Sequence, residues 1–159
     1  MQNITRLFDF PYYQLEHFNL PDALVTKYDN EWVKTSTQEY INKANALSRA
    51  LLNLGIQKND KIAVISSNNR TEWHISDIGI LQVGAQNIPI YPTISSEDYE
   101  YILNHSEAKY CFVSDQVVYD KLKEVQSRIP LLIDVYSFNE ISGCKKWSDL
   151  VTNGADTSN

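Results

Sequence analysis

The sequence has few of the patterns that mark a metal or phosphate site. Its two cysteines, Cys111 and Cys144, stand in no CxxC or Cys/His spacing, which favours reduced structural residues. Its five glycines never form GxGxxG. Gly79 and Gly84 have the spacing of a phosphate-binding loop but lack the Lys-Ser/Thr that completes one. The three histidines show no metal or triad spacing. We therefore expect no metal site and no phosphate cradle in this chain.

Positive charge and long apolar runs are also scarce. The formal net charge is −6 and no basic stripe is visible, which argues against a nucleic-acid partner. No run approaches the ~20 apolar residues of a transmembrane helix, and no signal-peptide pattern opens the chain. We expect a cytoplasmic protein. The 43% hydrophobic and 21% charged residues are ordinary for a globular chain, and 159 residues suit one domain with a sizeable core.

The strongest fold signal lies in residues 61–92. Residues 61–65 predict a strand buried on both faces, and the polar residues 66–69 predict the cap of a helix at 70–83 that is apolar on nearly every side. A second β-rich run, 85–91, contains a proline that cannot donate to a ladder, which indicates a strand that ends early or lies at a sheet edge. Together these segments predict one βαβ unit.

The remaining segments extend this pattern. An aromatic-rich stretch, 1–21, is interrupted by Pro11 and is expected to pack onto the body. Asp29-Asn30 predicts a hairpin turn, and Ser36 with Glu39 predicts a capping box. We expect strands at 23–28, 32–35, 109–114 and 131–136, and helices at about 36–54, 96–105, 115–129 and 147–151. This alternation predicts an α/β fold: a parallel, flavodoxin-like three-layer sheet with helices on both faces, plus an N-terminal β-hairpin.

Parallel sheets of this kind bind ligands beyond the carboxyl ends of their strands. Arg70 and Asp115 are the strongest candidates by position, although a solvated arginine and a helix N-cap are the simpler interpretations. The residues alone assign no catalytic, cofactor-binding or metal-ligating role. The surface expected to lie nearest a site consists of Asn68, Asn69, Arg70, Tyr91, Pro92 and Thr93.

Two long phrases carry a family resemblance. They are ANALSRALLNLGIQKNDKIAVISSNNRTEWHISDIGIL and VGAQNIPIYPTISSEDYEYILNHSEAKYCFV. With the hairpin that ends in Thr35, they resemble the amino-terminal portion of AMP-forming acyl-CoA synthetases, over residues 36–113 most closely. SNNRTEW and NIPIYPTISSEDYEYIL are most similar to the long-chain fatty acid–CoA ligases. The resemblance covers nearly the whole chain and loosens before Ala23 and after Asp134.

The resemblance implies a two-step reaction. A fatty acid carboxylate attacks ATP with the help of Mg²⁺ to give an acyl-adenylate and pyrophosphate, and the CoA thiol then displaces AMP. The family's phosphate loop, its Tyr-Gly-x-Thr-Glu segment, its ribose-binding Asp and its C-terminal-domain Lys are not found in this sequence. The resemblance thus implies that the enzyme's fatty acid, ATP, Mg²⁺ and CoA are handled with the remainder of the adenylating domain and the C-terminal domain.

The expected organisation follows from the resemblance. Residues 1–151 form the N-terminal α/β subdomain of the adenylating domain, and 152–159 form a structureless linker at which the chain is truncated. We expect this piece to be inactive alone and to bind no cofactor. We also expect it to self-associate, either by pairing through its orphaned apolar face or by exchange of the N-terminal segment. The parent enzyme is expected in the cytoplasm, where it can lie at the inner face of the membrane. A stand-alone flavodoxin-like nucleotide-binding module and a non-catalytic interaction domain remain alternatives.

Overall fold

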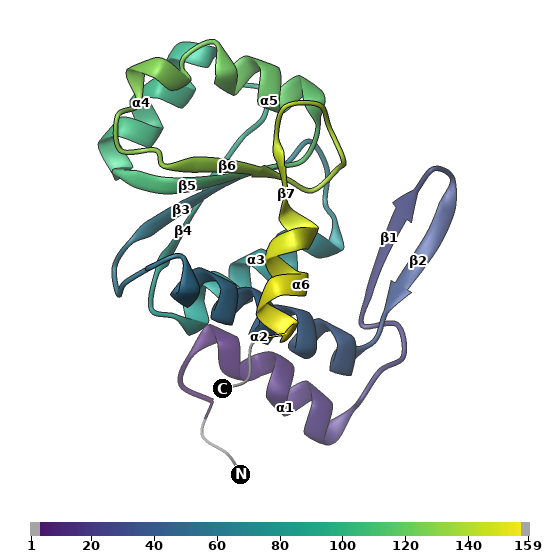
Figure 1. Cartoon of the computed structure of the whole chain (residues 1–159). Helices are drawn as coiled ribbons and strands as arrows, with labels where there is room; N and C mark the ends of the chain where they lie inside the picture. Colours follow the sequence, from purple (N-terminus) through teal and green to yellow (C-terminus); the bar gives the residue numbers. More distant parts are fainter. Residues whose placement is uncertain (1–3, 157–159) are drawn as a thin grey trace.

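The computed structural model describes residues 4–156, which form a parallel sheet with helices on both faces and a separate hairpin (Figure 1). The helices are α1 (Phe10–His17), α2 (Thr37–Asn53), α3 (Thr71–Gln82), α4 (Ser96–Ser106), α5 (Gln116–Lys123) and α6 (Trp147–Asp156), with 3-10 turns at Leu7–Asp9 and Gln126–Arg128. The strands are β1 (Leu24–Tyr28), β2 (Glu31–Thr35), β3 (Lys61–Ile65), β4 (Gln86–Ile90), β5 (Ala108–Val113), β6 (Asp134–Ser137) and β7 (Lys145–Lys146).

The main sheet has the strand order β4-β3-β5-β6-β7, and every neighbouring pair is parallel. Helices α2, α3 and α6 cover one face, and α4 and α5 cover the other (Figure 1). Strands β1 and β2 pair only with each other in the described part of the chain. The predicted fold class is confirmed, including the parallel sheet, the helices on both faces and the hairpin.

Alternation along the central strands builds the two cores. On β3, Ile62 and Val64 face α2 and α3, whereas Ala63 and Ile65 face α4 and α5. All four are at most 1% exposed, as expected for a parallel strand that is covered on both faces. Strand β4 lies at the edge of the sheet, which confirms the interpretation of its proline.

The turn and cap signals of the first half are confirmed. Asp29 and Asn30 form the two-residue hairpin turn with φ of 45° and 70°, a conformation that Asp and Asn tolerate. The Ser36 hydroxyl accepts from the Glu39 amide at 3.2 Å, and the Ser36 amide donates to the Glu39 carboxylate at 2.8 Å. This reciprocal pair opens α2 as the capping-box pattern predicts.

Two expectations for the N-terminal half are wrong. Pro11 does not interrupt a helix but lies in the first turn of α1, where its missing N–H has no partner to lose. The polar residues 66–69 do not cap α3. Arg70 is the N-cap residue, and its side chain makes no capping hydrogen bond.

The predicted helix at 115–129 is broken after Lys123. The amide of Val125 bonds the carbonyl of Leu122 at 3.1 Å, which tightens the chain into a 3-10 turn. Ile129 then precedes Pro130 and is displaced from the helical region to φ −119°, ψ 77°. The apolar run that follows is a loop up to Ile133, so the last long strand begins at Asp134, later than predicted.

Residues 152–156 are helical, so the expectation of a structureless tail is wrong for them. Helix α6 continues to Asp156 because Gly154 lets it lie directly against α2. A Cβ on Gly154 would stand 1.8 Å from the Ala46 carbonyl oxygen, and Arg49 Nε donates to the Gly154 carbonyl at 2.7 Å. Strand β7, which precedes α6, was not predicted. Residues 157–159 lie outside the described residues.

Buried apolar residues, among them Ala44, Leu47 and Leu51, form an apolar seam along α2, and substitutions there test the contribution of this seam to the core. Leu47 is fully buried, whereas Lys43 is exposed on the same helix. We expect Leu47→Ala to lower the free energy of unfolding by about 2–5 kcal/mol, because it leaves a cavity where α2 packs against Gly79 of α3. Lys43→Ala should stay within about 0.5 kcal/mol. Equal shifts of the urea midpoint for the two variants would mean that the seam does not carry the core.

Candidate functional site

The carboxyl edge of the sheet brings four of the six predicted surface residues together. Asn68, Asn69, Tyr91 and Pro92 line one hollow of about 280 Å³, which also contacts the ring of Trp73 on α3. Tyr91 is 79% exposed, so its ring stands at the rim. Arg70 and Thr93 do not line this hollow. The strand-end rule therefore located most of this surface from sequence.

Arg70 is buried, so the simpler interpretation of a solvated arginine is wrong. Its residue is 6% exposed, and its guanidinium binds the Glu72 carboxylate through two bonds, Nε to Oε2 at 2.9 Å and Nη2 to Oε1 at 2.7 Å. Nη1 donates to Asn139 Oδ1 at 2.9 Å and lies 3.4 Å from the Ser114 carbonyl oxygen. One side chain thus joins the start of α3 to the ends of β5 and β6.

Two aromatic rings complete this Arg70 cluster. The guanidinium carbon lies 5.4 Å from the ring centroid of Tyr28 and 5.2 Å from that of Phe138. The Tyr28 hydroxyl donates to Glu72 Oε2 at 2.6 Å, which ties the hairpin to α3. Burial and the adjacent carboxylate raise the pKa of Tyr28 to about 12. Burial opposes ionisation of Glu72, but bonds from Arg70 and Tyr28 outweigh it and hold the pKa of that carboxyl below its usual range.

A second hollow, of about 530 Å³, opens over the Arg70 cluster between the hairpin and the loop after β6. Its lining is mostly polar and comes from the hairpin tip, the loop after β3 and the loop after β6. Arg70 takes part in this wall but already uses its donors on Glu72, Asn139 and Ser114. The cluster therefore shapes this hollow rather than offering a free cation to a ligand.

The crevice between β3 and β5 is the point where the strand order reverses, and the chain's own side chains fill it. The buried Ser114 hydroxyl donates to Asp115 Oδ2 at 2.6 Å and accepts from the Ser67 amide at 2.9 Å. Asp115 also accepts from the Val118 amide at 3.1 Å, which confirms it as the N-cap of α5. Burial opposes its ionisation, but these bonds hold the pKa of Asp115 below its usual range. The Ser114 hydroxyl and the Asp115 carboxylate at this crevice therefore already bind groups of the chain itself.

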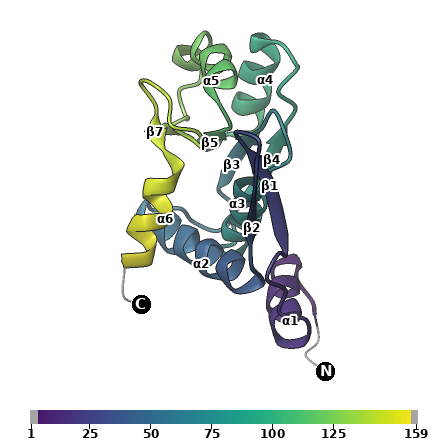
Figure 2. The same ribbon diagram turned by 90° about the vertical axis from the view of Figure 1, so that its right-hand side faces the viewer.

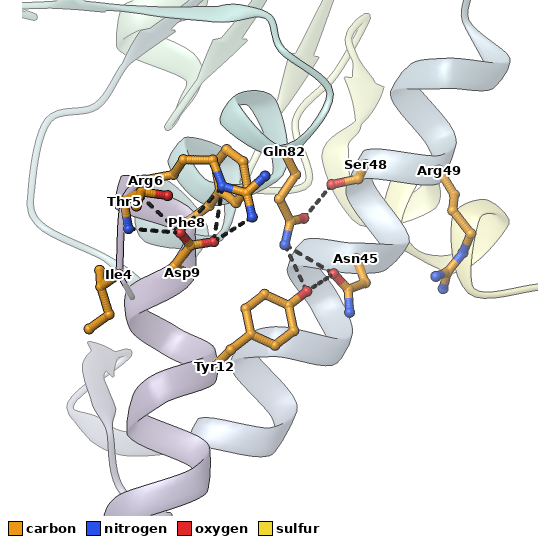
Figure 3. Close-up of a pocket in the computed structure, with 10 residues that line it drawn as sticks. All are labelled: Ile4, Thr5, Arg6, Phe8, Asp9, Tyr12, Asn45, Ser48, Arg49 and Gln82. Atoms are coloured by element: carbon orange, nitrogen blue, oxygen red, sulfur yellow. Dashed lines mark hydrogen bonds and ion pairs between the residues drawn. The ribbon is translucent and has the colours of Figure 1, made fainter. Parts of the chain in front are cut away.

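A third hollow lies away from the carboxyl edge, where the N-terminal segment meets α2 and α3 (Figure 3). It measures about 750 Å³. Gln82 Nε2 donates to the Tyr12 hydroxyl at 3.0 Å and to Asn45 Oδ1 at 3.1 Å, and Gln82 Oε1 accepts from the buried Ser48 hydroxyl at 2.6 Å. These residues are far apart in sequence and form no motif, so no sequence signal pointed to this hollow.

The described residues hold no metal-like constellation and no membrane span. In residues 4–156, no three His, Cys, Asp or Glu side chains gather closely enough to hold an ion. Within the same range, no helix combines the length and apolarity needed to cross a bilayer.

Comparison with known proteins identifies the family. The model of the AMP-binding enzyme family matches residues 16–155, so the chain belongs to that family. It is 34% identical over 107 residues to the long-chain-fatty-acid–CoA ligase FadD15 of Mycobacterium bovis, a match that covers 67% of this chain and 18% of that relative. It is 26% identical over 118 residues to the long-chain-fatty-acid–CoA ligase ACSBG2 of Xenopus laevis, a match that covers 74% of this chain and 16% of that relative. The resemblance to acyl-CoA synthetases is confirmed, and the chain spans about a fifth of these relatives' length.

Solved structures confirm the fold. The structure of a putative long-chain-fatty-acid CoA ligase from Rhodopseudomonas palustris superimposes with a TM-score of 0.78 at 20% identity, over 92% of this chain and 36% of that chain. FadD1, a long-chain-fatty-acid-CoA ligase from Archaeoglobus fulgidus, superimposes with a TM-score of 0.78 at 20% identity. This match covers 96% of this chain and 31% of that chain. The architecture described above is thus shared with part of each of these two chains.

Proposed function

We propose that this chain is the N-terminal α/β part of the adenylating domain of an ATP-dependent fatty acid–CoA ligase. The enzyme joins a fatty acid to CoA through an acyl-adenylate, and releases pyrophosphate and AMP. Two features support this proposal: the family match over residues 16–155 and relatives named as long-chain-fatty-acid–CoA ligases. In the proposed enzyme, this chain acts as a subdomain that includes the whole of helix α6, up to Asp156, and the groups that bind ATP, Mg²⁺ and CoA for chemistry lie outside this chain. The enzyme would work in the cytoplasm and meet fatty acids at the inner face of the membrane.

The structural observation that supports a part of a larger domain is the hairpin β1–β2, whose outer side chains no other part of the described chain covers. Strands β1 and β2 extend away from the sheet and pair with no further strand of the described chain (Figures 1 and 2). Trp32 is 67% exposed, and Val25 and Val33 are 44% and 45% exposed. An isolated two-stranded ribbon is marginal in water, so this one is expected to be covered by other protein.

One face of the hairpin is nevertheless held firmly. Thr26 and Thr71 share a hydroxyl–hydroxyl bond of 2.8 Å, and the Thr71 amide donates to Thr26 Oγ1 at 2.9 Å. Together with the bond from Tyr28 to Glu72, these contacts set the hairpin's direction from the start of α3. The opposite face of the ribbon, which carries Val25 and Trp32, is bare and suits a docking surface for the remainder of the adenylating domain.

The carboxyl-edge hollows are the proposed contribution to the substrate site. Asn68, Asn69, Tyr91, Pro92 and Thr93 would form a wall at which the remainder of the enzyme meets its substrates. Arg70 would act from beneath by fixing the loops after β3, β5 and β6. None of these residues is proposed to transfer a proton or to act as a nucleophile.

We predict that the isolated chain forms no acyl-adenylate. With palmitate, ATP and Mg²⁺, pyrophosphate release should equal that of a buffer blank, because the chain carries no phosphate-binding motif. Titration with ATP or AMP should likewise show no saturable binding at micromolar concentration. Fatty acid-dependent pyrophosphate release would contradict the proposal, and micromolar binding of AMP without turnover would favour a stand-alone nucleotide-binding module.

We also predict that the isolated chain self-associates through the hairpin. Sedimentation should show dimers or larger species as the concentration rises through the micromolar range, because the bare face carries exposed Trp32. Trp32→Ser should weaken this association at least about tenfold, since a large aromatic residue at an interface commonly contributes ~2 kcal/mol or more. Tyr101→Ser is the matched control, because Tyr101 is also 67% exposed but lies on α4. Equal association of both variants would place the contact elsewhere.

A further inference from the structure

The loop that follows β4, residues 91–94, is held from beneath by two neighbouring helices. Lys121 of α5 donates from Nζ to the carbonyl oxygens of Pro92 at 3.0 Å and Ile94 at 2.7 Å. The Tyr99 hydroxyl of α4 donates to the same Pro92 carbonyl at 2.9 Å. Its ring centroid lies 5.4 Å from Lys121 Nζ. Two side chains therefore place three polar contacts on one short loop.

The position of Lys121 Nζ is unusual for a cation. Ile94 directly precedes Ser95, the N-cap of α4, so the ammonium lies near the positive end of a helix dipole. No carboxylate forms an ion pair with it within residues 4–156. Two backbone carbonyls and the face of Tyr99 offset this unfavourable placement. The lysine's contacts therefore serve the loop rather than an ion pair between helices.

Tyr99 and Lys121 are both less exposed to solvent than Tyr91 and Thr93 of the loop that they hold. Tyr99 is fully buried, and Lys121 is half-buried, so the contacts approach from the core side. The loop's other side carries Tyr91, which is 79% exposed, and exposed Thr93. The two residues thus fix the backbone without covering the side chains that face outward.

We propose that Lys121 and Tyr99 are positioning residues that hold the loop 91–94 so that Tyr91 and Pro92 form one wall of the 280 Å³ hollow opposite Trp73. The inference rests on the proposed function, in which this hollow belongs to the surface that meets the ligase substrates. A wall of exposed side chains on a short loop binds well only when its backbone is fixed in advance.

The first test measures the loop itself in the 159-residue chain. Lys121→Met keeps the aliphatic stem and removes the donors, and Lys123→Met is the control because Lys123 is an exposed lysine on the same helix. Hydrogen exchange of a peptide spanning residues 91–95 should speed up at least about tenfold in Lys121→Met, because the substitution removes both charge-assisted bonds to the loop. Tyr99→Phe should give a smaller increase, and Lys121→Arg should restore most of the protection.

The second test measures the ligase reaction in the whole enzyme that contains this chain. Lys121→Met should lower kcat/KM at least about tenfold, mainly through KM for one substrate, with Lys123→Met unchanged. Unaltered loop exchange in Lys121→Met would overturn the inference, and so would a mobile loop with unaltered kinetics. An inactive wild-type enzyme would instead refute the proposed function, while the exchange measurement would still judge the loop contacts.

Discussion

Replacing Arg70 with methionine is expected to lower the free energy of unfolding by about 3–5 kcal/mol, because it leaves a buried carboxylate without its cation. The Glu72 side chain is 17% exposed and receives two bonds from Arg70. The same substitution removes the guanidinium from between Tyr28 and Phe138. Urea unfolding followed by far-UV circular dichroism measures the loss.

An exposed ion pair provides the matched control. Arg128 pairs with Glu100 at 2.7 Å, but its side chain is 52% exposed, so Arg128→Met should cost about 1 kcal/mol or less. Adding Glu72→Gln to Arg70→Met should recover part of the loss, because the buried charge is then gone. A loss for Arg70→Met no larger than that for Arg128→Met would show that the Arg70 cluster contributes little to stability.

The contribution of Glu72 should disappear in acid. Its folded-state pKa lies below the unfolded value, so its stabilisation is complete above the unfolded pKa of about 4.3 and is lost as the pH falls through the lower folded pKa. The stability difference between the wild type and Arg70→Met is therefore expected to be constant near pH 7 and to shrink in acid. A difference that grows as the pH falls would contradict this linkage.

Gly154→Ala is expected to displace α6 from α2. The added Cβ would lie 1.8 Å from the Ala46 carbonyl oxygen and 2.7 Å from its carbon, and backbone atoms in mid-helix cannot move aside. Overpacking of this kind costs ~1–3 kcal/mol or more, which exceeds the ~1 kcal/mol that alanine gains in a helix. Hydrogen exchange of residues 147–156 should increase strongly, together with a lower melting temperature.

Thr152→Ala is the control for Gly154→Ala, because it also introduces an alanine into α6 but creates no clash with α2. Thr152 is exposed on α6, and its hydroxyl donates only to the Ser148 carbonyl of the same helix in the described structure, so its replacement should leave α6 docked. Equal exchange in both variants, with no loss of stability, would mean that α6 does not depend on the close approach at Gly154.

Local signals made much of the fold predictable. The turn residues Asp29 and Asn30, the Ser36 capping box and the Asp115 cap each act within a few residues, and each was predicted correctly. The end of α6 was not predictable in this way. Gly154 has low helix propensity, and only its contact with another helix reveals why it stands there.

Only those residues of the candidate site whose positions follow directly from the strand order could be predicted from the sequence. The strand-end rule placed Asn68, Asn69, Tyr91 and Pro92 on one surface, because parallel strands end at the same edge. The burial of Arg70 was missed, since its partner Asn139 lies 69 residues away and belongs to no motif. The contacts of Lys121 with Pro92 and Ile94 were missed for the same reason.

We propose that this chain supplies one part of a fatty acid–CoA ligase and needs the remainder for chemistry. The most direct measurement is palmitate-dependent pyrophosphate release by the chain alone and by the same chain joined to the part of the Mycobacterium bovis relative that lies outside the matched region. We predict release by the joined protein and none by the chain alone. Release by the chain alone, or a folded joined protein that binds ATP and palmitate without releasing pyrophosphate, would contradict the claim.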